Sequence, residues 1–231
     1  MNYDQFHRTR LLLGEAGLNR LRHSHIAVVG CGAVGSFAVE ALARAGIGTL
    51  TLIDGDVVEI TNINRQLCAT HSTLGKPKTE VLKMRLHDIC PDTTVYTKNI
   101  FVDGRNADTL WEIRPDFVID AIDTITGKLP LILGLQKQNI PFISSMGAAR
   151  KTDWTKIKTA SLNQTQVCPL AAKLRKLLKD QNADLSFPCV FSAEKPTSAQ
   201  QENRQMGSLI TITGLFGLIL ANEAIQRILK S

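Results

Sequence analysis

Residues that could bind a nucleotide lie in the first half of the chain. The stretch GCGAVG contains Gly30, Gly32 and Gly35, with Ala33 among them. Glycines at this spacing let the chain turn tightly beside a phosphate, which the N–H groups at the start of a following helix attract. Asp54 follows Gly35 by 19 residues and could accept a ribose hydroxyl. These residues predict a nucleotide site without identifying the nucleotide.

The stretch DGDVVEITNINRQ (54–66) indicates that the nucleotide is a triphosphate. It contains Arg65, and the following GKPK contains Lys76 and Lys78. Backbone N–H groups and a helix dipole can largely neutralise the pyrophosphate of a dinucleotide. Substitution at the α-phosphorus of a triphosphate builds more charge, which arginine and lysine stabilise. The cations therefore favour ATP-like chemistry.

The motif DAID ends another apolar run and contributes two carboxylates, Asp120 and Asp123. Asp123 could hold Mg²⁺ against the phosphates. Taken alone, both residues could equally be caps at the end of a strand. Their occurrence with Asp54, Arg65 and Lys78 favours a functional role.

The segments around these residues alternate between strand and helix patterns. Short apolar runs predict strands at 26–30, 50–54, 93–97, 117–123 and 141–146, and helical patterns lie at 33–46, 77–89 and 128–138. This alternation predicts the α/β class, with a mostly parallel, Rossmann-like sheet covered by helices on both faces. Further along, we expect a smaller C-terminal sub-lobe, a helix opened by Pro169, a polar loop at 192–205 and an apolar C-terminal helix. The apolar run 207–221 has 15 residues, fewer than the roughly 20 that span a bilayer, so we expect a buried core helix.

Length predicts one domain of 231 residues, divided into a helical arm (1–24), a nucleotide-binding core (25–146) and the sub-lobe (147–231). Five cysteines, with no Cys-x-x-Cys pair, predict neither a zinc site nor a disulfide framework and favour a reducing cytoplasm. The amino-terminal residues do not form a secretory signal. The net charge of +6 equals the excess of bases over acids within 146–180. That segment is either a polyanion-binding surface or a solvated helix face.

The motifs GCGAVG, LIDGDVVEITNINRQ, GKPKTEV and DAID, in this order, resemble the adenylation domain of the ubiquitin-activating superfamily that includes ThiF, MoeB and HesA. The resemblance implies ATP and Mg²⁺ as ligands and a homodimer in which Arg8 reaches the partner's ATP. The sequence departs from the family pattern at Ala33, where a glycine is usual. The catalytic set it implies is Arg8, Arg65, Lys78 and Asp123. The ATP-binding set it implies is Gly30, Gly32, Ala33, Gly35, Asp54, Asp56, Asn64, Arg65, Gln66, Lys78 and Asp123, the last also holding the Mg²⁺.

Downstream, QVCPLAAKLRKLLK and PCVFSAEKP are similar to the branch formed by the tRNA threonylcarbamoyladenosine dehydratases. This resemblance implies adenylation of the threonyl carboxylate at adenosine 37, then cyclisation with release of AMP. It also implies a cysteine desulfurase and its sulfur acceptor as partners. Cys189 is either a reactive thiol or buried packing. The residues expected to bind tRNA are Arg150, Lys151, Lys173, Arg175, Lys176 and Lys179.

Three other functions compete with this interpretation. The nearest is adenylation of the C-terminus of a ubiquitin-like sulfur-carrier protein. A nicotinamide oxidoreductase would account for the glycine loop and Asp54 but leaves Arg65, Lys78 and Asp123 without a role. Ala33 and the basic segment could also fit an inactive tRNA-binding scaffold.

Overall fold

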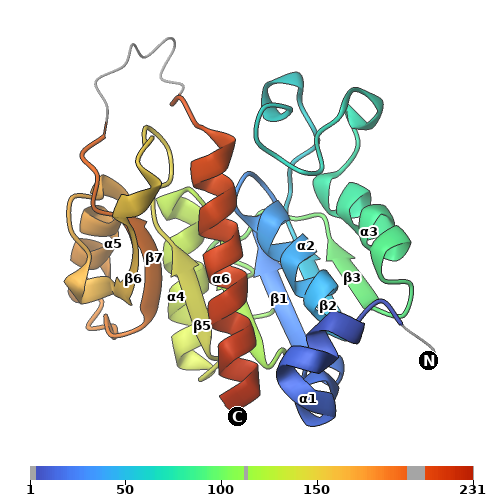
Figure 1. The fold of residues 1–231 in the computed structure, drawn as a ribbon. Coiled ribbons are helices and arrows are strands. Elements are labelled where there is room, and N and C mark those ends of the chain that lie inside the picture. Colours follow the sequence, from blue (N-terminus) through green and yellow to red (C-terminus); the bar gives the residue numbers. More distant parts are fainter. Residues whose placement is uncertain (1–3, 112–113, 197–205, 231) are drawn as a thin grey trace.

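The computed structural model describes residues 4–111, 114–196 and 206–230 (Figure 1). Its helices are α1 (His7–Arg22), α2 (Gly35–Ala45), α3 (Lys78–Ile89), α4 (Ile125–Lys137), α5 (Pro169–Asp180) and α6 (Ile210–Lys230). Its strands are β1 (His25–Val29), β2 (Thr49–Ile53), β3 (Thr94–Lys98), β4 (Phe117–Asp120), β5 (Phe142–Ser145), β6 (Ile157–Ser161) and β7 (Pro188–Ser192). Short 3-10 turns are η1 (Ile60–Asn62), η2 (His71–Thr73), η3 (Trp154–Lys156) and η4 (Leu162–Gln164).

The strands form one sheet of seven in the order β3-β2-β1-β4-β5-β7-β6. All neighbouring pairs are parallel except β6 with β7. The chain builds outward from β1 through β2 to β3, then returns to the other side of β1 with β4. In open α/β sheets, ligands bind at the carboxyl ends of the strands where the order reverses in this way. That position lies between β1 and β4.

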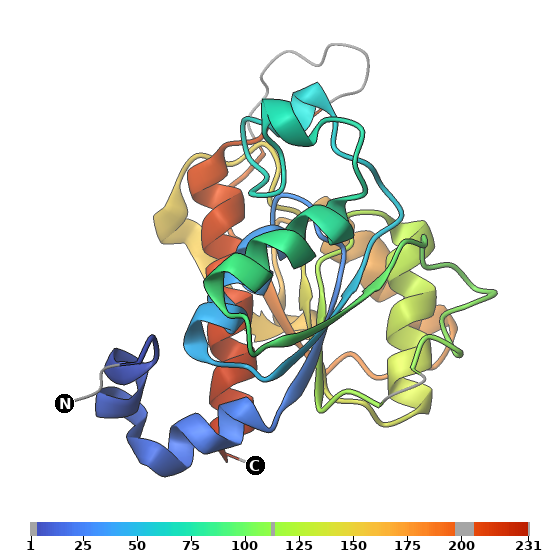
Figure 2. The same cartoon turned by 90° about the vertical axis from the view of Figure 1, so that its right-hand side faces the viewer.

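Helices cover both faces of the sheet. Apolar side chains of α1, α2, α3 and α6 form one core with one face, and those of α4 and α5 form a second core with the other. Figures 1 and 2 show α2 and α6 on the side opposite α4. The inner strands β1, β2, β4, β5 and β7 are short and almost entirely buried, as expected for strands covered on both faces, whereas the edge strands β3 and β6 are partly exposed. The predicted α/β, mostly parallel sheet is confirmed.

The described strands of the expected C-terminal sub-lobe join the main sheet. Strands β7 and β6 extend the same sheet beyond β5, because β7 pairs in parallel with β5. Helix α6 packs on α2 and on β4, β5 and β7. The helix runs 21 residues and is long and apolar enough to cross a membrane, yet half of its apolar window is buried inside the protein. Of the expected polar loop at 192–205, residues 197–205 lie outside the described residues.

The helical arm is kinked within α1. Gly14 has φ of 71°, so α1 kinks there. After the kink, Leu18 and Leu21 are buried in the core, whereas Leu11 and Leu12 before it are exposed. Arg8 is exposed in the first turn of the arm.

Candidate nucleotide site at the carboxyl edge of the sheet

The phosphate loop connects β1 to α2, and two of its glycines have no room for a side chain. Gly30 has φ of 89°, and a Cβ there would lie 2.8 Å from the carbonyl carbon of Ala121. A Cβ at Gly35 would lie 1.8 Å from the Gly30 oxygen. At Gly32 the nearest atom to such a Cβ is Nε2 of Gln66 at 3.6 Å, an ordinary contact. The loop therefore lies tightly against the β4–α4 turn and has more space at its tip.

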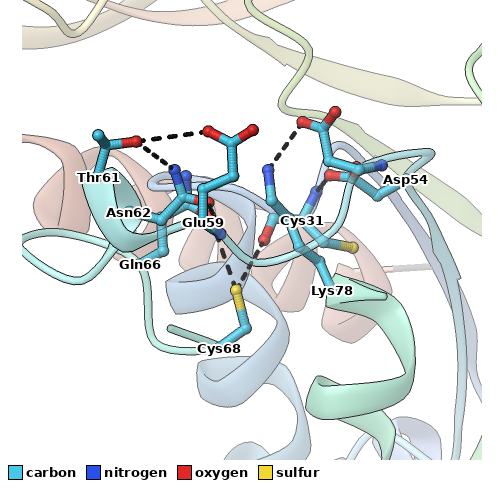
Figure 3. A network of polar contacts seen from close by, with 9 residues as sticks. Cys31, Asp54, Glu59, Thr61, Asn62, Gln66, Cys68 and Lys78 are labelled. Atoms are coloured by element: carbon cyan, nitrogen blue, oxygen red, sulfur yellow. Dashed lines mark hydrogen bonds and ion pairs between the residues drawn. The ribbon is translucent and has the colours of Figure 1, made fainter. Parts of the chain in front are cut away.

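Asp54 directly follows β2 and faces the phosphate loop (Figure 3). Its Oδ2 accepts a hydrogen bond from the backbone N–H of Cys31 at 2.6 Å, and its Oδ1 accepts one from Asp56 at 2.8 Å. Burial raises the pKa of Asp54, although these N–H groups and the Lys78 charge oppose the shift. The carboxylate is therefore fixed beside the loop, with lone pairs left for a ribose hydroxyl.

Lys78, the first residue of α3, is only 4% exposed and forms an ion pair with Asp56, with Nζ 2.8 Å from Oδ2. A single antiparallel bridge between Val57 and Pro77 brings the two residues together. Burial lowers the pKa of Lys78, but the Asp56 hydrogen bond and the charges of Asp54 and Asp56 outweigh this, and the net pKa is raised. Lys78 therefore keeps its positive charge at neutral pH and could exchange Asp56 for a phosphate.

Arg65 and its neighbours follow η1 on the long connection between β2 and α3. The Nη1 group of Arg65 donates to the Thr61 carbonyl at 2.6 Å and to Oδ1 of Asn64 at 2.8 Å. Nδ2 of Asn64 reaches the carbonyl of Ser208, just before α6, at 3.4 Å. Gln66 is buried against the tip of the phosphate loop. Nε and Nη2 of Arg65 make no hydrogen bond to the residues that the structure describes and can face a ligand.

Two cysteines fill the space beneath the loop. Cys31 and Cys68 are both buried, and Sγ of Cys68 lies 3.9 Å from the Cys31 carbonyl oxygen (Figure 3). Burial raises the pKa of Cys68 to about 11 and that of Cys31 well above its ordinary value. Both thiols are therefore protonated packing groups at neutral pH.

The β4–α4 turn carries Asp123, which is exposed. Behind it lies a charged group that sequence reasoning missed. Nζ of Lys128 donates to Oδ2 of Asp120 at 2.6 Å and to Oγ of Ser144 at 3.1 Å, and all three residues are fully buried. Oδ1 of Asp120 accepts from the N–H of Ile122 at 3.1 Å, which fixes the turn. The sequence signal for this pair was that Lys128 follows the strand-end Asp120 by eight residues. In the sequence, however, Lys128 looked like an ordinary helix residue.

The residues expected to bind tRNA do not share one environment. Lys173, Lys176 and Lys179 are exposed on α5. Lys151 is buried and donates to the Glu194 carbonyl, and Arg175 donates to the Thr165 carbonyl at 2.9 Å. These two side chains therefore stabilise the fold. Arg150 is half-buried, with a left-handed φ of 61°.

Cys189 lies on β7, between β5 and the edge strand β6, and is fully buried. Burial raises the pKa of its thiol far above the ordinary range, and the nearby Lys128 charge only partly offsets this. A reactive cysteine needs exposure and a lowered pKa. The structure therefore favours packing over the reactive thiol considered from the sequence.

The residues described above are suited to a nucleotide with several phosphates. A tight glycine loop lies beside a fixed carboxylate, a charged lysine and an arginine with free donors, all at the carboxyl edge of a parallel sheet. The fold and the site thus define a nucleotide-binding α/β protein with the charge needed for adenylation. The chain belongs to the ThiF family, whose model matches residues 6–231.

Known proteins resemble it over most of its length. A tRNA threonylcarbamoyladenosine dehydratase from Bacillus subtilis is 42% identical over 87% of this chain and 79% of its own. The Haemophilus influenzae enzyme of the same name is 40% identical over 99% of this chain and 95% of its own. The crystal structure of the E. coli tRNA N6-threonylcarbamoyladenosine dehydratase in complex with ATP superposes with a TM-score of 0.92 at 36% identity, covering 98% of this chain and 94% of that one. The resemblance inferred from the sequence motifs is confirmed.

Proposed function

We propose that this protein is an ATP-dependent tRNA threonylcarbamoyladenosine dehydratase. The observation that carries the proposal is that Asp54, Arg65 and Lys78 surround the glycine loop in a chain similar over nearly its whole length to enzymes of that name. ATP is the nucleotide, since the similar E. coli structure was determined with it. The site's charge is more than a nicotinamide dinucleotide requires.

The chemistry follows from the leaving group. A carboxylate is a poor acyl donor because it would have to expel oxide. Transfer of AMP to the threonyl carboxylate releases pyrophosphate and gives a mixed anhydride with a stable leaving group. The ureido group of the same modified base then attacks the acyl carbon, loses a proton and expels AMP, so the nucleoside loses one water in total. Because this attack is intramolecular, the protein mainly has to position the two groups.

Each residue has a role matched to its environment. Asp54 holds the ribose, while Arg65 and Lys78 stabilise charge on the phosphates during adenylation. Asn64 and Gln66 border the same path, and Asp56 holds Lys78 until the nucleotide arrives. Asp123 is a single exposed carboxylate, which suits Mg²⁺ because this ion takes one or two carboxylates together with substrate phosphates. The ion screens the phosphate charge when bound.

The proposal extends to the assembly. Exposed Arg8, on an arm with exposed Leu11 and Leu12, completes the site of a second copy in a homodimer. The exposed lysines of α5 contact the tRNA backbone, where salt-dependent binding is expected. The protein works in the cytoplasm, and a cysteine desulfurase with its sulfur acceptor is a further partner.

The test is incubation with Mg-ATP and tRNA containing threonylcarbamoyladenosine, followed by AMP measurement and mass analysis of the digested nucleosides. We expect loss of one water from that nucleoside, with one AMP per turnover. Arg65→Ala should lower the rate about 100- to 1000-fold, as for loss of one charge-stabilising donor. Arg105→Ala is the control, because this side chain is 92% exposed and its ion pair is with Asp103, two residues away.

An unchanged nucleoside mass would contradict the dehydratase. If AMP then appeared only on addition of a sulfur-carrier protein ending in Gly-Gly, the alternative adenylation function would replace it.

The dimer has its own test. Mixing inactive Arg8→Ala and Arg65→Ala subunits should restore about a quarter of the activity, because half of the dimers are mixed and each mixed dimer has one intact site. If Arg8 acted within its own chain, both sites of a mixed dimer would lack one arginine, and no activity would return.

A further inference from the structure

Trp154 is a large aromatic residue that the proposed reaction does not use. It opens the 3-10 turn η3, and 64% of it is exposed. A single exposed apolar residue needs no special explanation. Three features of Trp154 do need an explanation: the rigidity of its turn, the charges beside it and its place on the sheet.

Hydrogen bonds fix the turn that carries Trp154 on both sides. Asp153 accepts hydrogen bonds from the backbone N–H of Thr155 at 2.9 Å and from its hydroxyl at 2.6 Å. The carboxylate of Glu194, beyond β7, accepts from the N–H groups of Thr152 and Asp153 at 3.0 Å each. The indole is therefore presented by a fixed backbone, which lowers the entropy cost of binding a ligand.

The charges beside Trp154 are suited to a polyanion. Lys156 lies in the same turn and Lys158 follows on β6, and both are exposed. The two nearby carboxylates, Asp153 and Glu194, accept hydrogen bonds from backbone N–H groups of the turn itself. An exposed aromatic ring beside free lysines is the combination that binds single-stranded nucleic acid, with the base on the ring and the phosphates on the cations.

The sheet places this ring at the same edge as the nucleotide site. Strand β6 is antiparallel to β7, with Ile157 opposite Ser192, so its start lies at the carboxyl ends of the parallel strands. Four strand spacings separate β6 from β1 in the sheet order, or roughly 19 Å. That separation is within the dimensions of a tRNA loop a few nucleotides long.

We propose that Trp154 stacks on an unpaired base of the tRNA anticodon loop while the threonyl carboxylate of the modified adenosine lies beside the α-phosphate of ATP in the nucleotide site. The inference rests on the proposed function and adds to it a base-binding position outside the adenylation chemistry. Sequence-tolerant stacking would select an open loop over a duplex, because paired bases do not expose their faces. Lys156 and Lys158 would hold the backbone on either side of that base.

The experiment uses the intrinsic fluorescence of Trp154. The chain has two tryptophans, so Trp111→Phe leaves Trp154 as the only reporter. Titration with threonylcarbamoyladenosine-containing tRNA should quench its emission, with the same midpoint as binding measured by filter retention. Trp154→Ala in the natural chain should weaken tRNA binding about 5- to 100-fold, the loss expected for one stacked base. ATP affinity and melting temperature should stay unchanged.

Two variants control for structure. Trp154→Phe keeps a stacking ring and should retain most of the affinity. Tyr96→Ala removes a 44% exposed aromatic from β3, at the opposite edge of the sheet, and should have no effect. Binding of tRNA without a change in Trp154 emission, together with normal affinity of Trp154→Ala, would overturn the inference while leaving the dehydratase intact. If wild-type protein neither bound nor modified tRNA, the proposed function and the inference would fall together.

Discussion

The glycines of the phosphate loop are not equivalent as single residues. Gly35→Ala would place its methyl 1.8 Å from the Gly30 oxygen, so the loop must move, whereas the methyl of Gly32→Ala would have 3.6 Å to the Gln66 amide. We expect Gly35→Ala to lose ATP binding and about 1–3 kcal/mol of stability. Gly32→Ala should fold normally and bind ATP with a modest loss. Nucleotide titration and urea unfolding of both variants would check this, and equal behaviour would contradict the geometry.

Lys128 is the residue whose loss should cost most stability. It is fully buried against Asp120, so Lys128→Met leaves a buried carboxylate without its cation. Breaking a buried pair in this way costs about 3–5 kcal/mol. Lys137→Met on the same helix is the control, since that side chain is 71% exposed and its pair with Asp108 should be worth no more than about 1 kcal/mol. Urea unfolding would measure the stability of both variants. Similar losses of stability would show that the Lys128–Asp120 pair does not stabilise the fold.

Among the elements, α6 depends on close approach to α2. A Cβ at Gly217 would lie 2.2 Å from the Val34 carbonyl oxygen and 2.8 Å from Cβ of Phe37. Gly217→Ala should therefore separate the two helices and cost about 1–3 kcal/mol, even though alanine favours the helical state. Asn222→Ala, on the exposed face of α6, should be neutral or slightly stabilising. A stabilised Gly217→Ala variant would mean that the helices pack less closely.

The connection between β2 and α3 shows how an element without regular structure positions a site. Its ends are joined by the Val57–Pro77 bridge, and Lys78 pairs with Asp56 there. Arg65 is held by its own segment through Thr61 and Asn64. The motif spacing predicted that these cations act together, but the bridge that brings Lys78 to Asp56 could not be read from it.

At the scale of the whole molecule, all five cysteines are buried. Burial raises the pKa of Cys31, Cys68, Cys90 and Cys189, so their thiolate fractions at pH 8 are below that of an exposed cysteine. We expect less than one thiol per chain to react with a disulfide reagent in the native state and five in denaturant. A single fast thiol abolished by Cys189→Ser would instead establish Cys189 as reactive.

The same shifts predict a loss of stability in alkali. For Cys68 the folded pKa of about 11 exceeds the ordinary 9.0, so the unfolded chain loses its proton first as pH rises. The contribution of Cys68 to the free energy of unfolding is therefore fully present below pH 9 and is lost between pH 9 and about 11. Urea unfolding of wild-type and Cys68→Ala protein across this range would measure it. A pH dependence identical in the two proteins would contradict the assignment.

The sequence by itself determined the local structure and the family. Strand and helix patterns depend on neighbouring residues, and the phosphate-loop glycines and Asp54 are close in sequence to the turns that use them. The tertiary structure alone decided which side chains meet across the sheet. It paired Lys128 with Asp120, bound Lys151 and Arg175 into the fold, buried Cys189 and joined β6 and β7 to the main sheet. These outcomes depend on contacts between segments far apart in the chain, and residue type and spacing do not specify such contacts.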